Sequence, residues 1–361
     1  MEVLHVFDTM EIKSASGLYE VEFDQTYFTK LESFIGTSSH FIIDSNLVAL
    51  YPEALSRVIS HPNTIVIDAS EYSKEIMRVL PIIEGLIESG IRREHTLVAI
   101  GGGVVQDITC FISSVLFRGV SWKFIPTTLL AQADSCIGSK SSINFGQNKN
   151  ILGTFKPPQK ILICPMFLET LDQNQILSGV GEIIKVHAID GIDSYDSVSV
   201  AYDDMFRDPL ILLEFIKRAL RIKKKFIELD EFDRGIRNIF NYGHSFGHAI
   251  ESATEFAIPH GVAITIGMDM AIRIASWRNL LSEDHYNRMH PVLSKNYAPY
   301  KSTKIPLDKL ISALKKDKKN TAESLVLIMP MGEDASVQKT EVLADEKFLA
   351  QCESFLSSLP L

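Results

Sequence analysis

The first half of the chain alternates short apolar segments with longer helical patterns, and this alternation limits the possible folds more than any other feature. The helical pattern is clearest at 73–90, SKEIMRVLPIIEGLIESG. Strands that alternate with helices of this length form a parallel sheet with helical crossovers. Five segments are predicted as its strands: HFIIDSN (40–46), NTIVIDAS (63–70), HTLVAIGGG (95–103), WKFIPTT (122–128) and KILICP (160–165).

The second half of the chain is predicted to be mainly helical. Strand signals become rare after about residue 168, and amphipathic helical patterns replace them, as at 211–229 and 266–281. One late strand at 324–331 precedes a helical tail. Because 361 residues exceed one average domain, we expect two: an α/β domain at 1–167 and a helical domain at 168–361.

Charge and composition exclude several classes of protein. The net charge is -9 and no basic stripe offsets it, so a nucleic-acid partner is not expected. The longest apolar runs are far shorter than the roughly 20 residues of a membrane span, and the N-terminus shows no signal-peptide pattern. Cys110, Cys136, Cys164 and Cys352 follow no disulfide or metal-binding spacing, so we expect reduced thiols in a cytoplasmic protein.

A glycine turn follows the predicted strand 95–103 and begins a helix. Gly101, Gly102 and Gly103 have no side chains to keep a diphosphate from the backbone, and a helix N-terminus favours negative charge. Asp44 ends an earlier strand, where a carboxylate can accept hydrogen bonds from ribose hydroxyls. A nucleotide site is one interpretation, although the run is not a G-x-G-x-x-G fingerprint. The other interpretation is purely structural: the glycines form a tight strand-to-helix turn, and Asp44 caps a helix.

Histidines close together in the second half indicate a metal site. His244 and His248 lie four residues apart on a predicted helix and share a face, and His260 follows in a Pro-His-Gly turn. Upstream, Glu182 and Lys185 lie three residues apart on another helix. One carboxylate with two or three imidazoles suits zinc with a position open for substrate. Spacing alone does not choose the ligands, and a single histidine is more often a surface or core residue.

Long blocks with polar residues at fixed offsets run from about Ile43 to Asn320: GGGVVQD, FRG, PTTLLAQADSCIGSKSSIN, NKNILGTF, SGVGEIIK, RNIFNYGHSFGHAIE, HG-x-A and KKDKKN. In content and order they resemble the 3-dehydroquinate synthase family, within the sugar-phosphate cyclase superfamily. The resemblance covers most of the chain. It implies an N-terminal Rossmann-like α/β domain that binds NAD and a mainly α-helical C-terminal domain that binds metal and substrate.

The resemblance also implies site residues at the matching positions. The ligands of a divalent metal, zinc or cobalt, would be Glu182, His244 and His260. NAD would be contacted by Asp44, Gly102, Gly103, Asp107, Thr127, Thr128, Phe167 and Thr170. The catalytic residues would be Asp134, Lys140, Asn150, Lys185 and His248, with His248 aiding proton transfer. The remaining substrate-binding residues would be Arg118, Lys149, Lys223, Arg237, Asn241 and Lys318.

Two of these assignments bear on substrate and assembly. Lys223 and Arg237 match a pair that holds a substrate carboxylate, and Arg118 matches an arginine that reaches the neighbouring subunit's site, which implies a homodimer. The implied reaction converts 3-deoxy-arabino-heptulosonate 7-phosphate to 3-dehydroquinate and phosphate, a step of the shikimate pathway of aromatic amino acid biosynthesis. NAD takes a hydride and returns it, phosphate is eliminated, and an intramolecular aldol reaction closes the ring.

Two other enzymes fit parts of the sequence. A sister cyclase of secondary metabolism would act on sedoheptulose 7-phosphate or glucose 6-phosphate, which lack the carboxylate that Lys223 and Arg237 would hold. A metal-dependent polyol dehydrogenase would need NAD but no cluster of phosphate-binding residues.

Three positions depart from the family pattern. Gln106 stands where GGGVVGD has glycine, Val262 where HGEA has glutamate, and Asp172 where TLP has proline. Gln106 adds bulk beside the expected nucleotide, and Val262 removes a charge next to His260. Either change could alter substrate choice or weaken metal binding.

Overall fold

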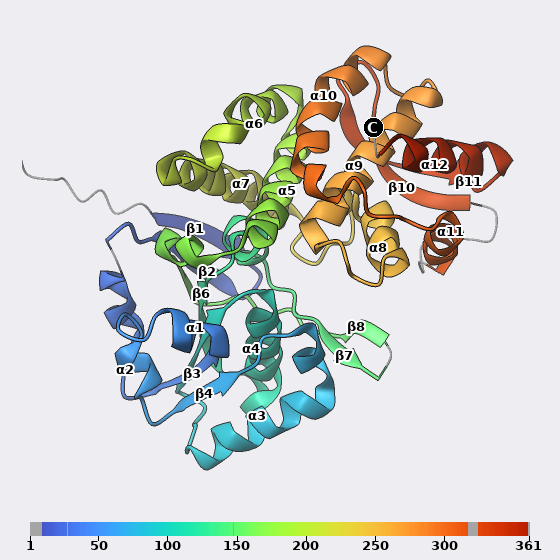
Figure 1. Cartoon of the computed structure of the whole chain (residues 1–361). Coiled ribbons are helices and arrows are strands. Elements are labelled where there is room, and N and C mark those ends of the chain that lie inside the picture. Colours follow the sequence, from blue (N-terminus) through green and yellow to red (C-terminus); the bar gives the residue numbers. More distant parts are fainter. Residues whose placement is uncertain (1–8, 27, 147, 317–323, 360–361) are drawn as a thin grey trace, which may run out of the picture. The chain divides into compact units, whose positions relative to one another are not determined.

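The computed structural model describes residues 9–26, 28–146, 148–316 and 324–359. The chain divides into two compact units, Met1–Leu171 with Lys224–Phe232, and Asp172–Lys223 with Asp233–Leu361. The first unit is built on a parallel sheet with helices, and the second is mainly helical (Figure 1). The predicted fold class is therefore confirmed.

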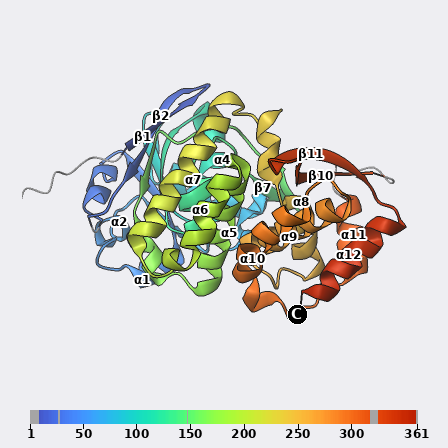
Figure 2. The ribbon, with the colours of Figure 1, turned by 90° about the horizontal axis from the view of Figure 1, so that it is seen from above.

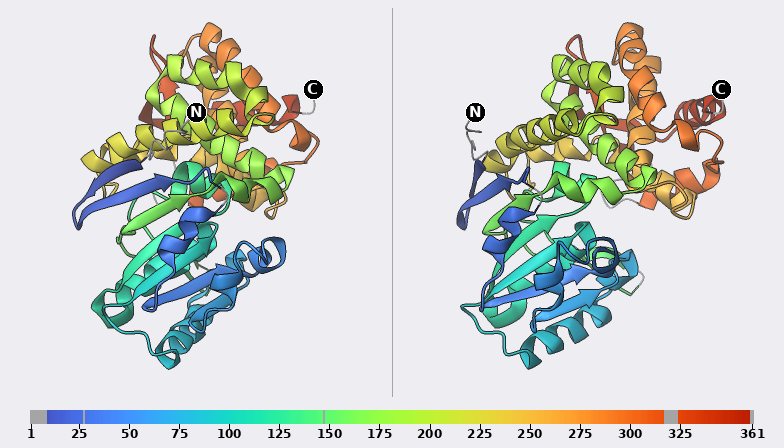
Figure 3. Two further views of the ribbon diagram at one scale, coloured as in Figure 1. Left: turned by 90° about the vertical axis from the view of Figure 1, so that its left-hand side faces the viewer. Right: turned by 60° about the vertical axis from the view of Figure 1, so that its left-hand side comes forward.

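The centre of the α/β unit is a seven-stranded sheet in the order β1-β2-β9-β6-β5-β3-β4 (Figure 3). β1 pairs antiparallel with β2, and every other neighbouring pair is parallel. β3, β5, β6 and β9 are almost wholly buried, as expected for parallel strands with both faces covered. The strands are β1 (Thr9–Ser14), β2 (Gly17–Phe23), β3 (Ser39–Asp44), β4 (Thr64–Ile67), β5 (Thr96–Gly101), β6 (Ser121–Pro126) and β9 (Lys160–Ile163).

Helices and short turns complete the α/β unit. Apolar side chains on one face of the sheet, such as Phe41, Val98 and Ile125, pack against residues from the first helices, such as Leu47 and Val58. Each such buried side chain contributes about 1.5–3 kcal/mol. The elements are α1 (Ser45–Leu50), α2 (Ser56–Ile59), η2 (Glu71–Lys74), α3 (Ile76–Glu88), α4 (Gly103–Val115), the turn η4 (Ala131–Ser135), and the hairpin of β7 (Ile143–Phe145) and β8 (Asn148–Leu152).

The helical unit is organised around α9, which is buried along most of its length and packs beside α8 and α10 (Figure 2). A helix that is apolar on all sides belongs in the centre of a bundle. Across the described residues we find no helix with the length and apolar character that crossing a membrane would need. The elements are α5 (Gln173–Asp190), α6 (Ile192–Met205), α7 (Pro209–Leu229), η6 (Ile236–Asn241), α8 (His244–Ala253), α9 (His260–Trp277), α10 (Glu283–Asn296), α11 (Leu307–Lys316), β10 (Ser324–Met331), β11 (Ser336–Leu343) and α12 (Glu346–Ser358). The end of α7, from Lys224, belongs to the α/β unit.

Candidate functional site

The residues expected to contact NAD gather at the carboxyl ends of four adjacent parallel strands. Asp44 ends β3, Gly102 follows β5, Thr127 follows β6 and Phe167 comes shortly after β9. From β3 the chain continues to β4 on one side, whereas from β5 it continues to β6 on the other. Open α/β sheets bind ligands where the strand order reverses in this way. The structure thus brings the expected cofactor positions to the edge where a nucleotide would bind.

The glycine turn after β5 is crowded at two residues and open at the third. A Cβ atom on Gly101 would overlap Val105, and one on Gly102 would lie 2.9 Å from Cγ2 of Thr128. A Cβ on Gly103, the first residue of α4, would meet no described atom within 4 Å. Glycine is therefore required for packing at the first two positions. The space at the third leaves the helix N-terminus accessible to a phosphate group.

Several expected cofactor residues also have structural roles. The Asp44 carboxylate caps α1 by accepting a hydrogen bond from the backbone N–H of Asn46 at 3.0 Å, and burial raises its pKa. Phe167 is 1% exposed, with its ring centroid 5.1 Å from that of Tyr51. The hydroxyl of Tyr51 lies 2.9 Å from that of Thr170. The capping interpretation of Asp44 is confirmed, and its contact with a ribose stays a prediction.

Lys74 joins two of the expected site residues and was missed by sequence reasoning. Its Nζ lies 2.9 Å from Oδ2 of Asp107 and donates a hydrogen bond to Oδ1 of Asn150 at 2.8 Å. Lys74 is only 5% exposed. Burial raises the pKa of Asp107 to about 6, against the opposing effect of the Lys74 charge. A single lysine before a helix has no spacing signature, so only the folded structure connects it to the site.

Two of the substrate-binding residues expected in the α/β unit, Arg118 (φ 62°) and Asn150 (φ 54°), have left-handed backbone, as does the neighbouring Phe117 (φ 50°). Such conformations cost about 1–3 kcal/mol at a non-glycine residue and cluster at functional sites. Asp134 lies in η4, a π-helical turn. The exposed members of the set are Arg118, Lys140, Lys149 and Asn150.

In the helical unit, glycines allow three helices to approach at backbone distance. A Cβ atom on Gly267 of α9 would overlap the carbonyl oxygen of Gly243, which precedes α8. A Cβ on Gly261 of α9 would overlap the carbonyl oxygen of Ser178 in α5. These close contacts bring together the faces of α5, α8 and α9 that carry the expected metal ligands.

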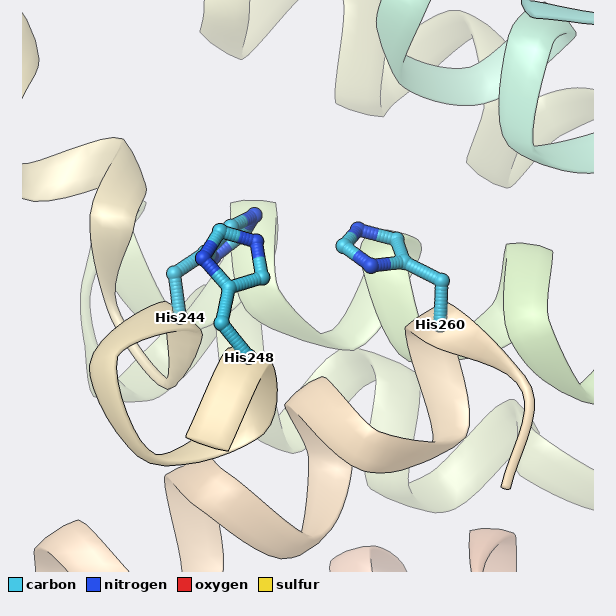
Figure 4. Close-up of side chains that lie close together, drawn as sticks. All are labelled: His244, His248 and His260. Carbon is cyan, nitrogen blue, oxygen red and sulfur yellow. The ribbon is translucent and has the colours of Figure 1, made fainter. Parts of the chain in front are cut away.

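Three histidines meet where α8 and α9 begin. Figure 4 shows His244 and His248 extending from one helix and His260 facing them from the start of the next. One nitrogen atom from each ring lies within 4.8 Å of the others. Oε1 of Glu182, on α5, lies 3.7 Å from Nε2 of His260. The structure therefore groups the three expected ligands, Glu182, His244 and His260, together with His248.

The charges around this cluster favour a bound cation. Glu182 is 1% exposed; its Oε2 pairs with the ammonium of Lys185, and its Oε1 has no hydrogen-bond partner among the described residues. Burial and the nearby charge of Lys185 lower the pKa of His244 well below its usual value, which keeps that imidazole neutral, the form that binds metal. Burial alone would lower the pKa of His260, but Glu251 and then Glu182 raise it. A buried carboxylate beside imidazoles fits a divalent metal ion.

Glu251 orients His260 and was also missed by sequence reasoning. Both of its carboxylate oxygens lie 3.2 Å from Nδ1 of His260. A carboxylate at Nδ1 directs Nε2 of the ring toward a metal. Glu251 lies seven residues after His244 on the same helix, a spacing that could have revealed it. Val262, which lacks the family's carboxylate, is fully buried in α9, and the carboxylate that contacts His260 in this chain is that of Glu251.

The residues expected to hold the substrate carboxylate are buried. Lys223 is 6% exposed and Arg237 is 7% exposed, although Lys223 belongs to a run of three lysines that is typical of a solvated face. Buried cations are rare unless anionic groups accompany them. The amide of Asn241 donates a hydrogen bond to the carbonyl of Asn238 at 3.0 Å. Lys318 lies outside the described residues.

Solved structures with a similar fold include two synthases and, at lower TM-scores, reductases and alcohol dehydrogenases. ValA, a 2-epi-5-epi-valiolone synthase from Streptomyces hygroscopicus with NAD+ and Zn2+ bound, has a TM-score of 0.80 and 25% identity, covering 96% of this chain and 98% of its own. A 2-deoxy-scyllo-inosose synthase complexed with carbaglucose-6-phosphate, NAD+ and Co2+ has a TM-score of 0.80 and 23% identity, covering 97% and 100%. The fold is that of the sugar-phosphate cyclase superfamily.

Sequence comparison narrows this class. The family model described as 3-dehydroquinate synthase N-terminal matches residues 64–178, and that described as 3-dehydroquinate synthase C-terminal matches residues 179–320. A 3-dehydroquinate synthase of Thermoanaerobacter sp. (strain X514) is 34% identical over 354 residues, which cover 93% of this chain and 98% of the relative. The chain belongs to the 3-dehydroquinate synthase family.

Proposed function

We propose that this protein is a 3-dehydroquinate synthase, a phosphate-eliminating carbon–oxygen lyase that converts 3-deoxy-arabino-heptulosonate 7-phosphate to 3-dehydroquinate and phosphate. The observation that carries the proposal is the cluster of His244, His248 and His260 beside Glu182, in a chain of this family.

Glu182, His244 and His260 would hold a divalent metal ion, zinc or cobalt. Bound there, the metal would act as a Lewis acid toward the sugar hydroxyls. Glu251 would keep Nε2 of His260 directed at the ion. His248, the exposed histidine of the cluster, would transfer a proton at a ring nitrogen.

The carboxyl edge of the α/β sheet would hold NAD, with its diphosphate near Gly103 and its ribose near Asp44. Bound NAD would accept a hydride from the substrate and return it later, so none is consumed. Lys74 and Asp107 would fix the position of Asn150 beside the sugar, since the lysine contacts both residues.

The substrate is the finer part of the proposal. Lys223 and Arg237 would bind its carboxylate, and burial of both side chains would strengthen that charge contact. Sedoheptulose 7-phosphate and glucose 6-phosphate carry no carboxylate, so these two residues favour the heptulosonate. Asp134 would bind a sugar hydroxyl. The residues proposed to bind the phosphate are Lys140, Lys149, Lys185, Asn241 and Lys318.

The function is tested by incubating the metal-loaded protein with NAD and one sugar phosphate at a time. We expect phosphate release from 3-deoxy-arabino-heptulosonate 7-phosphate, a carbocyclic product in the mass spectrum, and no net NADH. Turnover of sedoheptulose 7-phosphate or glucose 6-phosphate, without turnover of the heptulosonate phosphate, would instead identify a sister cyclase. Net NADH from a polyol, without phosphate release, would identify a dehydrogenase.

We also propose a homodimer in which Arg118 reaches the neighbouring copy's site. Mixing two inactive variants, Arg118→Ala and His260→Ala, tests this directly. If Arg118 acts across the interface, random subunit exchange restores about one quarter of the wild-type sites, because half of the dimers then contain one intact site. No recovery from a mixture shown to exchange subunits would contradict the arrangement.

A further inference from the structure

The side chain of Gln106 contacts a π-helical turn. Gln106 is the fourth residue of α4 and is 7% exposed. Its Nε2 donates a hydrogen bond to the backbone carbonyl of Ser135 at 2.6 Å, and its Oε1 accepts one from the Ser135 hydroxyl at 2.7 Å. Because a carbonyl oxygen can only accept, the amide nitrogen must face it, and this fixes the orientation of the amide group.

The contacted turn, η4, carries Asp134 and ends at Ser135. Its π-type hydrogen bond runs from the backbone N–H of Cys136 to the carbonyl of Ala131 at 2.9 Å. Single π-helical turns are rare and frequently lie at functional sites. The last carbonyls of any helix have no partner within it. Gln106 provides that missing partner for Ser135.

A second glutamine fixes the beginning of the same turn. Gln132 is fully buried, and its Nε2 donates hydrogen bonds to the carbonyls of Pro126 and Cys164, both at 3.0 Å. Pro126 ends β6 and Cys164 follows β9, so the start of the turn is tied to the sheet. Gln106 ties its end to α4. Asp134 lies between the two attachments.

We propose that Gln106 is a positioning residue that holds η4, and with it Asp134, and that it is not a nucleotide contact. Both polar atoms of its side chain are engaged with Ser135 rather than directed at the glycine turn. A glycine at this position, as in the family pattern, has no side chain to form these bonds. The effect on catalysis rests on the proposed function, in which Asp134 binds a sugar hydroxyl.

Four variants separate this role from the alternatives. Gln106→Glu keeps the shape but places an oxygen against the Ser135 carbonyl, and Gln106→Gly removes both bonds. Ser135→Ala removes only the bond from the hydroxyl. Ser114→Ala is the matched control, because its hydroxyl bonds to the Phe111 carbonyl within α4 at 2.6 Å, away from the turn. Amide hydrogen exchange at 131–136, the Kd for NAD and the kinetics of phosphate release are measured for each.

We expect Gln106→Glu, which loses the bond to the Ser135 carbonyl, to speed amide exchange at 131–136 by about tenfold, the effect of losing one buried hydrogen bond. Gln106→Gly, which loses both bonds, should speed it at least as much. We expect kcat to fall by about tenfold, with the Kd for NAD within about threefold of wild type. Ser135→Ala should have a smaller effect, and Ser114→Ala none.

Unchanged amide exchange at 131–136 in Gln106→Glu would overturn the proposal. If this variant also binds NAD more weakly than wild type, Gln106 is a nucleotide contact instead. Faster exchange with unchanged kcat and KM would show that the bonds do not position Asp134. If the wild-type protein releases no phosphate from any sugar phosphate, the proposed function fails, while exchange still decides whether Gln106 holds the turn.

Discussion

At the scale of single residues, we expect metal affinity to depend on the carboxylate of Glu251. Glu251→Gln preserves the shape but removes the charge that orients His260, so we expect metal affinity to fall by about 10–100-fold. Competition with a chromogenic chelator measures this. The control is Glu255→Gln, which removes an exposed carboxylate paired with Lys309 and should leave affinity unchanged. Equal affinities in the two variants would rule out the orienting role.

His260→Ala removes a proposed ligand directly. We expect the variant to lose bound metal and phosphate release together, because three protein ligands are needed to hold zinc at an open site. Metal content by elemental analysis and activity are measured on the same sample. Full activity without bound metal would refute the assignment.

Site residues that recur at fixed offsets in the sequence could be predicted, but residues that folding brings to them from distant segments could not. The grouping of Glu182, His244 and His260 follows from helix faces and from the family resemblance. Lys74 could not be found this way, because its partner Asp107 is brought to it only by folding. Whether these residues bind metal and cofactor stays a prediction.

A departure from the family pattern can also have a local structural cause. Asp172, which replaces a proline, caps α5 by accepting a hydrogen bond from the backbone N–H of Gln175 at 2.8 Å, and the Gln175 side chain reciprocates. Such a capping box satisfies two helix-end donors. This substitution therefore needs no explanation in terms of substrate.

At the scale of elements, the contact between α8 and α9 depends on glycine. In Gly267→Ala the new methyl would overlap the carbonyl oxygen of Gly243, which is backbone and cannot rotate away. Separating the helices should lower the free energy of unfolding by about 1–3 kcal/mol and weaken metal binding. Gly36→Ala is the control, since its methyl would lie 3.6 Å from the Ser39 hydroxyl, an ordinary contact. Equal denaturation midpoints for the two variants would contradict this.

Strands formed by continuous apolar runs were predictable from sequence, and strands interrupted by charged or polar residues were not. The five strands predicted for the sheet and the late strand at 324–331 are confirmed, as are the helices predicted within 73–90, 211–229 and 266–281. Continuous apolar runs or helical periodicity mark these segments. The hairpin of β1 and β2, the hairpin of β7 and β8, and strand β11 were missed. Their exposed positions carry charged and polar side chains, so no apolar run marks them as strands.

At the scale of the whole molecule, two buried histidines, one in each unit, couple stability to pH. Burial and then the neighbouring His95 lower the pKa of His40 to about 4. Burial also lowers the pKa of His187 to about 4, although the hydrogen bond to the Ile183 carbonyl has the opposite effect. As the pH falls, both histidines become protonated near pH 6.5 in the unfolded chain, but only near pH 4 in the folded chain. Stability is therefore full above about pH 6.5 and is lost as pH falls toward 4, by up to about 3 kcal/mol for each histidine.

Urea denaturation of wild type and His187→Leu at pH 7.5 and 4.5 measures this coupling. We expect wild type to lose more stability than the variant on acidification, because leucine takes up no proton. The measurement at pH 7.5 is the internal reference, since His187 is then neutral in both folded and unfolded states. Identical losses in the two proteins would exclude His187 as a source of the acid sensitivity.

The α/β unit also includes Lys224–Phe232, the end of α7 and the residues after it, from much later in the chain. Glu228 and Glu231 accept hydrogen bonds from the backbone N–H groups of Lys13 and Ala15 at the β1–β2 hairpin, at 2.9 and 2.7 Å. A gene fragment that ends at Leu171 would encode this sheet without those acceptors. A single recombination crossover therefore could not exchange one unit for that of a related cyclase. A chimaera would have to take Lys224–Phe232 from the same parent as the sheet that these residues contact.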